Sequence, residues 1–150
     1  MKKTQVKTHF IKWLSIEEIH HDSKEWLLEL DFLKDEYHFF VDLIKCNTIE
    51  LIDFQGVAEC NKIIETLSDA KKENDNLMKL VKAHEKKLVI LVDEVKHAKD
   101  EEDAYKDEHV KLIILMKNHL LEHRSLKLSL FDILKKIKRI EKQKHRIDVE

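Results

Sequence analysis

The chain has 150 residues, of which 43% are hydrophobic and 39% are charged, and its formal net charge is -2. This composition excludes a wholly disordered chain and suits one domain. It lacks the basic excess of nucleic-acid-binding domains, and no stretch is apolar for long enough to span a bilayer. We therefore expect a protein partner or a homodimer, with no nucleic-acid partner and no transmembrane segment.

Glycine occurs once and proline is absent. Sheets, tight turns and irregular loops usually need these residues at particular backbone angles, whereas long helices do not. Lys, Glu, Leu and Ile dominate, as is typical of coiled coils. The sequence therefore predicts an all-α protein.

Residues 1–14 are expected to form an N-terminal arm that packs on the helices, because Val6, Phe10, Ile11 and Trp13 are too apolar to stay in water. The arm lacks the continuous apolar segment and the small-residue cleavage site of a signal peptide, so it is not interpreted as one. The remaining residues, 15–150, are expected to form a single helical-bundle domain.

The first predicted helix covers residues 15–55. Its start is indicated by Ser15 and Glu18, which have the spacing of a capping box, and its end by Gly56, a residue suited to positive φ. Apolar residues recur along it in alternating steps of three and four, the spacing of a helix face. This face contains Ile19, Trp26, Leu30, Leu33, Tyr37, Phe40, Ile44, Leu51 and Phe54.

A second apolar face runs from Ile63 to Ile140. The acidic residues between Asp100 and Asp103 favour a new helix start, so we expect helices over 57–99 and 103–145. Three long helices with short connections predict an elongated antiparallel bundle. The alternative is a four-helix bundle with a break near Asn74, where several helix-unfavourable residues follow one another.

Phe32 and Phe39 lie seven residues apart, away from the main apolar face. They indicate that the first helix is covered on a second side, either by the arm or by another subunit. The sequence is therefore consistent with a monomer and with a homodimer.

Catalytic motifs are missing, because the glycine-rich loops that hold phosphates or expose nucleophiles cannot be built from one glycine. No enzymatic activity is predicted. The two cysteines, Cys46 and Cys60, form no CxxC motif and suit a reducing cytoplasm. We expect a cytoplasmic location.

Histidine is unusually frequent, with ten residues, and four of them fall on the apolar faces. If the second and third helices turned back near Glu101, His84 would lie level with His119 and His123, and a turn at Gly56 would bring Glu29 near. Three imidazoles and a carboxylate could bind Fe or Zn. The alternative interpretation is a set of packed histidines without metal.

Two weaker signals accompany these histidines. The ExxH pairs, such as Glu17 with His20 and Glu94 with His97, resemble ligand pairs of ferritin-like di-iron bundles, although the full ligand order of that family is not present. The basic run KKIKRIEKQKHR, residues 135–146, could contact phosphates or anionic lipids, but its positive charge also complements the negative end of the last helix dipole.

The leading functional hypothesis is a non-enzymatic cytoplasmic helical-bundle protein that acts through protein–protein contacts. The alternative is a metal-binding bundle with His84, His119, His123 and Glu29 as the ligands of Fe or Zn.

Overall fold

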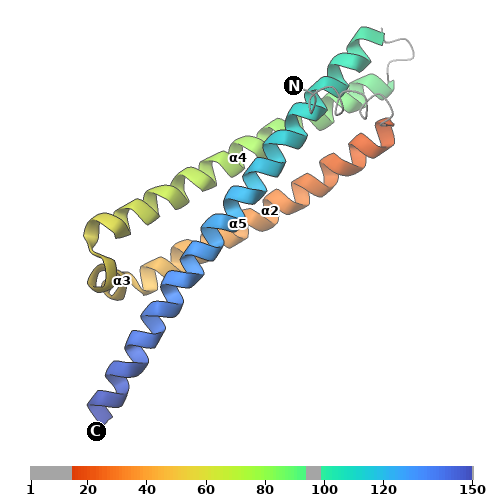
Figure 1. The fold of residues 1–150 in the computed structure, drawn as a ribbon. Helices are drawn as coiled ribbons and strands as arrows, with labels where there is room; N and C mark the ends of the chain where they lie inside the picture. The colour runs from red at the N-terminus through yellow and green to blue at the C-terminus, as the bar shows by residue number, and fades with distance from the viewer. Residues whose placement is uncertain (1–14, 94–98, 150) are drawn as a thin grey trace, which may run out of the picture. The chain divides into compact units, whose positions relative to one another are not determined.

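The computed structural model describes residues 15–93 and 99–149. These residues form α2 (Ile16–Cys46), α3 (Thr48–Gln55), α4 (Val57–Asp93) and α5 (Lys99–Val149), drawn in Figure 1. No strand occurs in these two ranges. The predicted all-α class is confirmed.

The first predicted helix is interrupted at Asn47, which separates α2 from α3. The Asn47 Nδ2 atom donates to the Leu43 carbonyl oxygen at 2.7 Å, and the Thr48 hydroxyl donates to the Ile44 carbonyl oxygen at 2.8 Å. Such local side-chain bonds compete with the helical ladder and favour a break. The expectation of one continuous helix over 15–55 was therefore wrong at Asn47.

Helix α4 continues through Asn74 without a break, so the fourth described helix comes from the interruption at Asn47 and not from the site proposed in the four-helix alternative. The Asn74 side chain is fully buried, and its Nδ2 atom donates to the carbonyl oxygen of Leu30 on α2 at 2.9 Å. Because this amide bonds another helix, it does not disturb its own. Helix α5 begins at Lys99, close to the predicted start at Asp103.

Both predicted helix-end signals are confirmed. The backbone N–H of Glu18 donates to the Ser15 hydroxyl oxygen at 3.1 Å. Gly56, between α3 and α4, has a φ of 89°, and its N–H donates to the Ile52 carbonyl oxygen at 2.8 Å. The chain therefore passes from α3 to α4 through a conformation that favours glycine.

Substituting Gly56→Val is expected to lower the free energy of unfolding by about 1 kcal/mol or more, because a β-branched residue is strained at positive φ. A Cβ atom there would meet no atom within 4 Å, so steric overlap would not contribute. Urea unfolding followed by circular dichroism measures the change. Ala58→Val, at an exposed position two residues later, is the matched control, and an equal loss in both variants would contradict the assignment.

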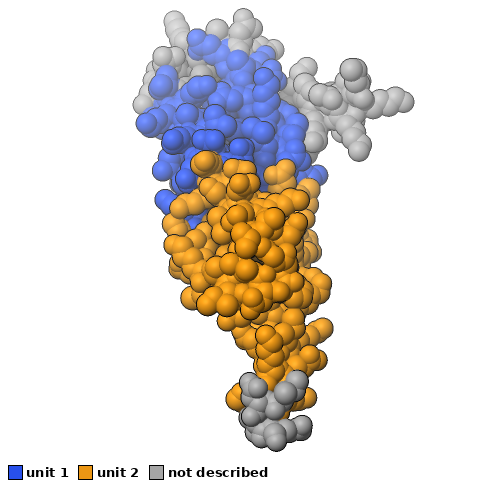
Figure 2. All heavy atoms as spheres, turned by 90° about the vertical axis from the view of Figure 1, so that its left-hand side faces the viewer, with its two compact units in different colours: residues 1–34, 73–119 blue, residues 35–72, 120–150 orange. Residues whose placement is uncertain are grey.

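Two compact units divide the chain, and Figure 2 shows them in different colours. Unit 1 combines residues up to Lys34 with Glu73–His119, and so contains parts of α2, α4 and α5. Cross-helix bonds from Asn74 to Leu30 and from His20 to Glu85 show that α2 and α4 run in opposite directions within this unit. Its buried apolar residues include Ile19, Leu30, Leu33, Leu77, Val81, Leu88, Tyr105, Leu112 and Met116.

Unit 2 combines Asp35–Lys72 with residues from Leu120 onward, and so contains α3 and the other parts of α2, α4 and α5. Phe40 packs edge-on against Phe131, with ring centroids 5.9 Å apart. Its buried apolar residues include Tyr37, Phe40, Ile44, Leu51, Cys60, Leu67, Leu130 and Ile137.

These buried residues confirm most of the predicted apolar faces. Phe54 is an exception, with 40% of its surface exposed. Phe32 and Phe39 are 63% and 54% exposed, so no other described part of the chain covers them. The predicted arm, residues 1–14, lies outside the described residues. None of the described helices is both long and apolar enough to cross a membrane.

Candidate functional site

A partly buried chain of hydrogen bonds crosses unit 1 between α2, α4 and α5. The Nε2 atom of His84 lies 3.1 Å from the Nδ1 atom of His109, and the Nε2 atom of His109 lies 3.1 Å from the Oδ2 atom of Asp22. Both rings are fully buried. We call Asp22, His84, His109 and Glu108 the histidine relay.

The carboxylate at one end of the histidine relay determines where its protons lie. Because an ionised carboxylate only accepts, His109 donates through Nε2 to Asp22 and accepts at Nδ1 from His84. The Nδ1 atom of His84 then carries no proton. Among the described residues it has no hydrogen-bond partner, and the Glu108 Oε1 atom lies 3.7 Å away, which is too far for a hydrogen bond.

Burial controls the protonation of both rings. Burial, followed by repulsion from His109, lowers the pKa of His84 from 6.5 to about 4, against the attraction of Glu108. Burial also lowers the pKa of His109, although the hydrogen bond and the charge of Asp22 act in the opposite direction. Both rings are therefore neutral at physiological pH.

Aromatic rings enclose the relay on two sides. Tyr105 stacks on His84 with ring centroids 4.2 Å apart, and Trp26 stacks on His109 at 4.8 Å. Burial raises the pKa of the Tyr105 hydroxyl, which therefore stays protonated. The relay thus lies in apolar surroundings that disfavour charge.

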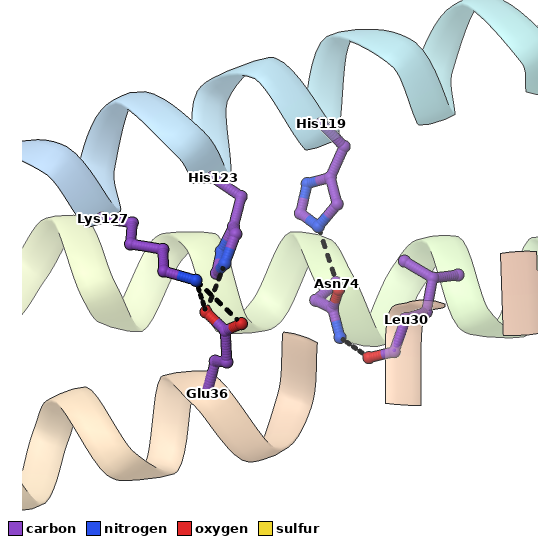
Figure 3. A network of polar contacts seen from close by, with 6 residues as sticks. All are labelled: Leu30, Glu36, Asn74, His119, His123 and Lys127. Atoms are coloured by element: carbon purple, nitrogen blue, oxygen red, sulfur yellow. Dashed lines mark hydrogen bonds and ion pairs between the residues drawn. The ribbon is translucent and has the colours of Figure 1, made fainter. Parts of the chain in front are cut away.

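His119 takes part in a second buried contact of unit 1. Its Nε2 atom lies 2.9 Å from the Oδ1 atom of Asn74, whose Nδ2 atom in turn donates to Leu30 (Figure 3). One amide therefore links all three helices of this unit. Since an amide oxygen only accepts, His119 donates through Nε2.

His123 forms a separate network in unit 2. Its Nε2 atom lies 3.0 Å from Glu36, and the ammonium group of Lys127 lies 3.1 Å from the same carboxylate (Figure 3). Burial alone would raise the pKa of Glu36, but the hydrogen bonds from His123 and Lys127 outweigh it and lower that pKa. Tyr37 packs edge-on against His123 at 4.9 Å.

The four residues predicted as metal ligands have different neighbours. His84 pairs with His109, ten positions before the expected His119, while His119 itself contacts Asn74. Glu29 is exposed on α2, and His123 contacts Glu36. Sequence reasoning missed Asp22 and Asn74 as partners, because Asn74 was interpreted as a possible helix break and not as a buried amide that bonds other helices.

The ExxH histidines contact carboxylates other than those of their motifs. His20 lies 2.9 Å from Glu85, and His21 lies 3.7 Å from Glu25. Glu94 and His97 lie outside the residues whose side chains are described. Within the described ranges, no three His, Cys, Asp or Glu side chains lie close enough together to hold a metal ion.

The metal hypothesis stays a prediction that chelation can test. We expect EDTA at neutral pH to leave the melting temperature unchanged, because His109 uses both ring nitrogens in hydrogen bonds within the protein and His84, His119 and His123 each use Nε2. Elemental analysis of the purified protein supplies the second measurement. Stoichiometric Fe or Zn, with a melting temperature that EDTA lowers in the natural protein but not in His119→Ala, would contradict this expectation.

Several exposed apolar side chains lie on and beside α3 in unit 2. Leu51 is the one α3 residue that is buried, whereas Ile49 and Phe54 are 74% and 40% exposed. Ile52 and the following Val57 are 36% and 58% exposed. We call Ile49, Ile52, Phe54 and Val57 the α3 patch.

A cleft of about 210 Å³ adjoins the α3 patch in unit 2. Its apolar lining combines Phe54 of α3 with Ile137 and Ile140 of α5. Its charged lining consists of the carboxylates of Glu50, Asp53 and Glu141 and the ammonium group of Lys144. The sequence analysis did not predict this surface, because it treated residues 48–55 as the last turns of one long helix and not as a separate helix.

The fold and these sites define the class as an all-α helical-bundle protein with buried histidine networks. No protein-family profile, curated protein or solved structure matches the chain.

Proposed function

We propose that this chain is a non-enzymatic cytoplasmic helical-bundle protein that acts through protein–protein contacts, and that the α3 patch is its contact surface. The observation that carries the proposal is the exposure of the four large apolar side chains of this patch within nine consecutive residues. Such concentrations mark interaction surfaces, whereas single exposed apolar residues are ordinary.

The stability of α3 supports the same interpretation. A helix of eight residues is marginal by itself, and α3 has one buried apolar anchor, Leu51. A partner that covers Ile49 and Ile52 would add the apolar burial that α3 lacks in the isolated chain. The partner is either a second copy of the chain or a different protein.

The cytoplasmic location is part of the proposal. Cys46 is exposed and Cys60 is buried, and both are free thiols. Free thiols persist in reducing compartments, whereas secreted domains commonly pair their cysteines. The polar interior is also explained without catalysis, since the described histidines on the apolar faces bond to Asp22, Glu36, Asn74 and one another.

Site-specific crosslinking in cells tests the contact surface. A photoreactive phenylalanine analogue placed at Ile49 should capture one defined protein, while the same analogue at Lys62, an exposed polar position on α4 in the same unit, should not. The captured protein is then purified, and Ile49→Glu should weaken its binding at least about tenfold, the effect expected for an apolar anchor. Equal crosslinking at both positions, or unchanged binding by Ile49→Glu, would overturn the proposal.

A further inference from the structure

We propose that the cleft beside the α3 patch receives an arginine side chain of the protein partner; this inference rests on the proposed function and specifies the chemistry of its partner. The lining of the cleft, its charge and its size each favour this occupant.

The charge of the cleft favours a cation. Glu50, Asp53 and Glu141 place three carboxylates around it, against one ammonium group from Lys144. Among the described residues none of these four side chains takes part in a hydrogen bond or ion pair, so the carboxylates are available to a partner. The C-terminal end of α3 lies beside the cleft at Phe54, and the dipole of a helix makes its C-terminal end attractive to cations.

The apolar lining of the cleft favours a cation that also has apolar surface. Ile137 is nearly fully buried, and the ring of Phe54 is partly open to the cleft. An arginine side chain has an aliphatic stem that can cover isoleucine, and its planar guanidinium group stacks on aromatic rings and bonds carboxylates through two N–H groups. A lysine ammonium group is a compact, strongly hydrated charge and gains less from Phe54.

The size of the cleft favours one side chain over a larger ligand. At about 210 Å³ it is smaller than the roughly 300–1,000 Å³ typical of sites for drug-sized molecules. Arginine is among the residues that most often anchor protein interfaces, and anchors of this kind fill pockets next to apolar contacts. Ile49 and Ile52 of the α3 patch supply such an apolar contact on the same short helix.

A titration of the full chain with a blocked arginine, N-acetylarginine amide, tests the cleft without the partner. We expect saturable shifts of the backbone amide NMR signals of Phe54 and Glu141. The isosteric but uncharged N-acetylcitrulline amide should bind at least about tenfold more weakly, since hydrogen bonds to charged groups are stronger than those between neutral groups. Equal shifts with both compounds, or none at Phe54 and Glu141, would overturn the inference.

Three variants separate charge from stacking. Asp53→Asn and Glu141→Gln should each weaken arginine binding several-fold, and Phe54→Leu should reduce the preference for N-acetylarginine amide over N-acetyllysine amide. Glu65→Gln, an exposed carboxylate of α4 in the same unit, should change nothing. Unaltered binding in Asp53→Asn and Glu141→Gln would overturn the inference, and circular dichroism confirms that every variant is folded.

The crosslinked partner distinguishes failure of this inference from failure of the proposed function. If Ile49→Glu abolishes partner binding and Asp53→Asn weakens it as well, both proposals are supported. If Ile49→Glu abolishes it while Asp53→Asn and Glu141→Gln leave it unchanged, the arginine is rejected and the contact surface stands. If the blocked arginine binds but Ile49 captures no protein, the contact function is rejected, and with it the assignment of the arginine to a protein partner.

Discussion

Lowering the pH from about 7 to about 5 is expected to reduce the free energy of unfolding by about 2 kcal/mol through His84 alone. The pKa of this buried ring is lowered to about 4 in the folded protein, against about 6.5 for an unfolded histidine. Between these values the unfolded chain binds a proton that the folded chain does not. Stability is therefore complete above about pH 6.5 and decreases as the pH falls towards the folded pKa.

The groups that face His84 come from every helix packed around it. Asp22 of α2 is linked to His84 through His109. Lys87 lies on the same helix as His84, α4, and the Glu108 carboxylate of α5 lies 3.7 Å from the unprotonated Nδ1 atom of His84. The lowered pKa of His109 adds acid sensitivity of the same sign. Glu36 of unit 2 also has a lowered pKa, but its effect begins below its ordinary value of 4.5, outside this pH range.

Urea unfolding at a series of pH values measures this effect. His84→Gln should remove most of the decrease between about pH 6.5 and pH 5, since glutamine can still bond His109 but does not titrate. His38→Gln, an exposed histidine of α2, is the matched control and should keep the full decrease. The same stability at both pH values in the natural protein would show that His84 is not buried as a neutral ring.

Replacing Leu30 with aspartate should unfold unit 1 or leave it without fixed packing. Leu30 is fully buried on α2. The substitution removes its apolar contacts, a loss of about 2–5 kcal/mol for shortening a buried leucine, and adds the cost of an unpaired buried carboxylate. A total of this size is comparable with the whole stability of a typical domain of about 5–15 kcal/mol.

Circular dichroism and urea unfolding compare Leu30→Asp with Lys34→Asp, a partly buried position one turn further along α2. Leu88→Asp, at a second buried position of unit 1, should behave like Leu30→Asp. The Lys34→Asp protein should remain close to the natural one. If all three variants lost stability equally, the assignment of the buried face of α2 would be refuted.

Local signals in the sequence were sufficient for the helical class and for the face that each long helix buries, although the break at Asn47 was missed. Ser15 caps α2, Gly56 adopts positive φ, and the residues predicted to be apolar anchors, such as Leu30 and Val81, are buried. Burial of His84 and His119 was predicted in the same way. These features depend on residues within a turn or two of each other, so the spacing of side chains along the chain determines them.

The partners of the buried residues were decided by tertiary structure alone. His84 pairs with His109 instead of His119, so different residues lie level on α4 and α5 than the sequence predicted. In an antiparallel pair of helices, moving the centre of the turn by five residues along the chain changes the partner of every residue by ten positions. The apolar periodicity along one helix is the same in both registers, so it cannot predict which register forms. The sequence by itself therefore determined that this protein is helical and that the four histidines on its apolar faces are buried. Only packing between helices decided that His84 meets His109 and Asp22, because the register between two helices depends on contacts that neither helix contains by itself.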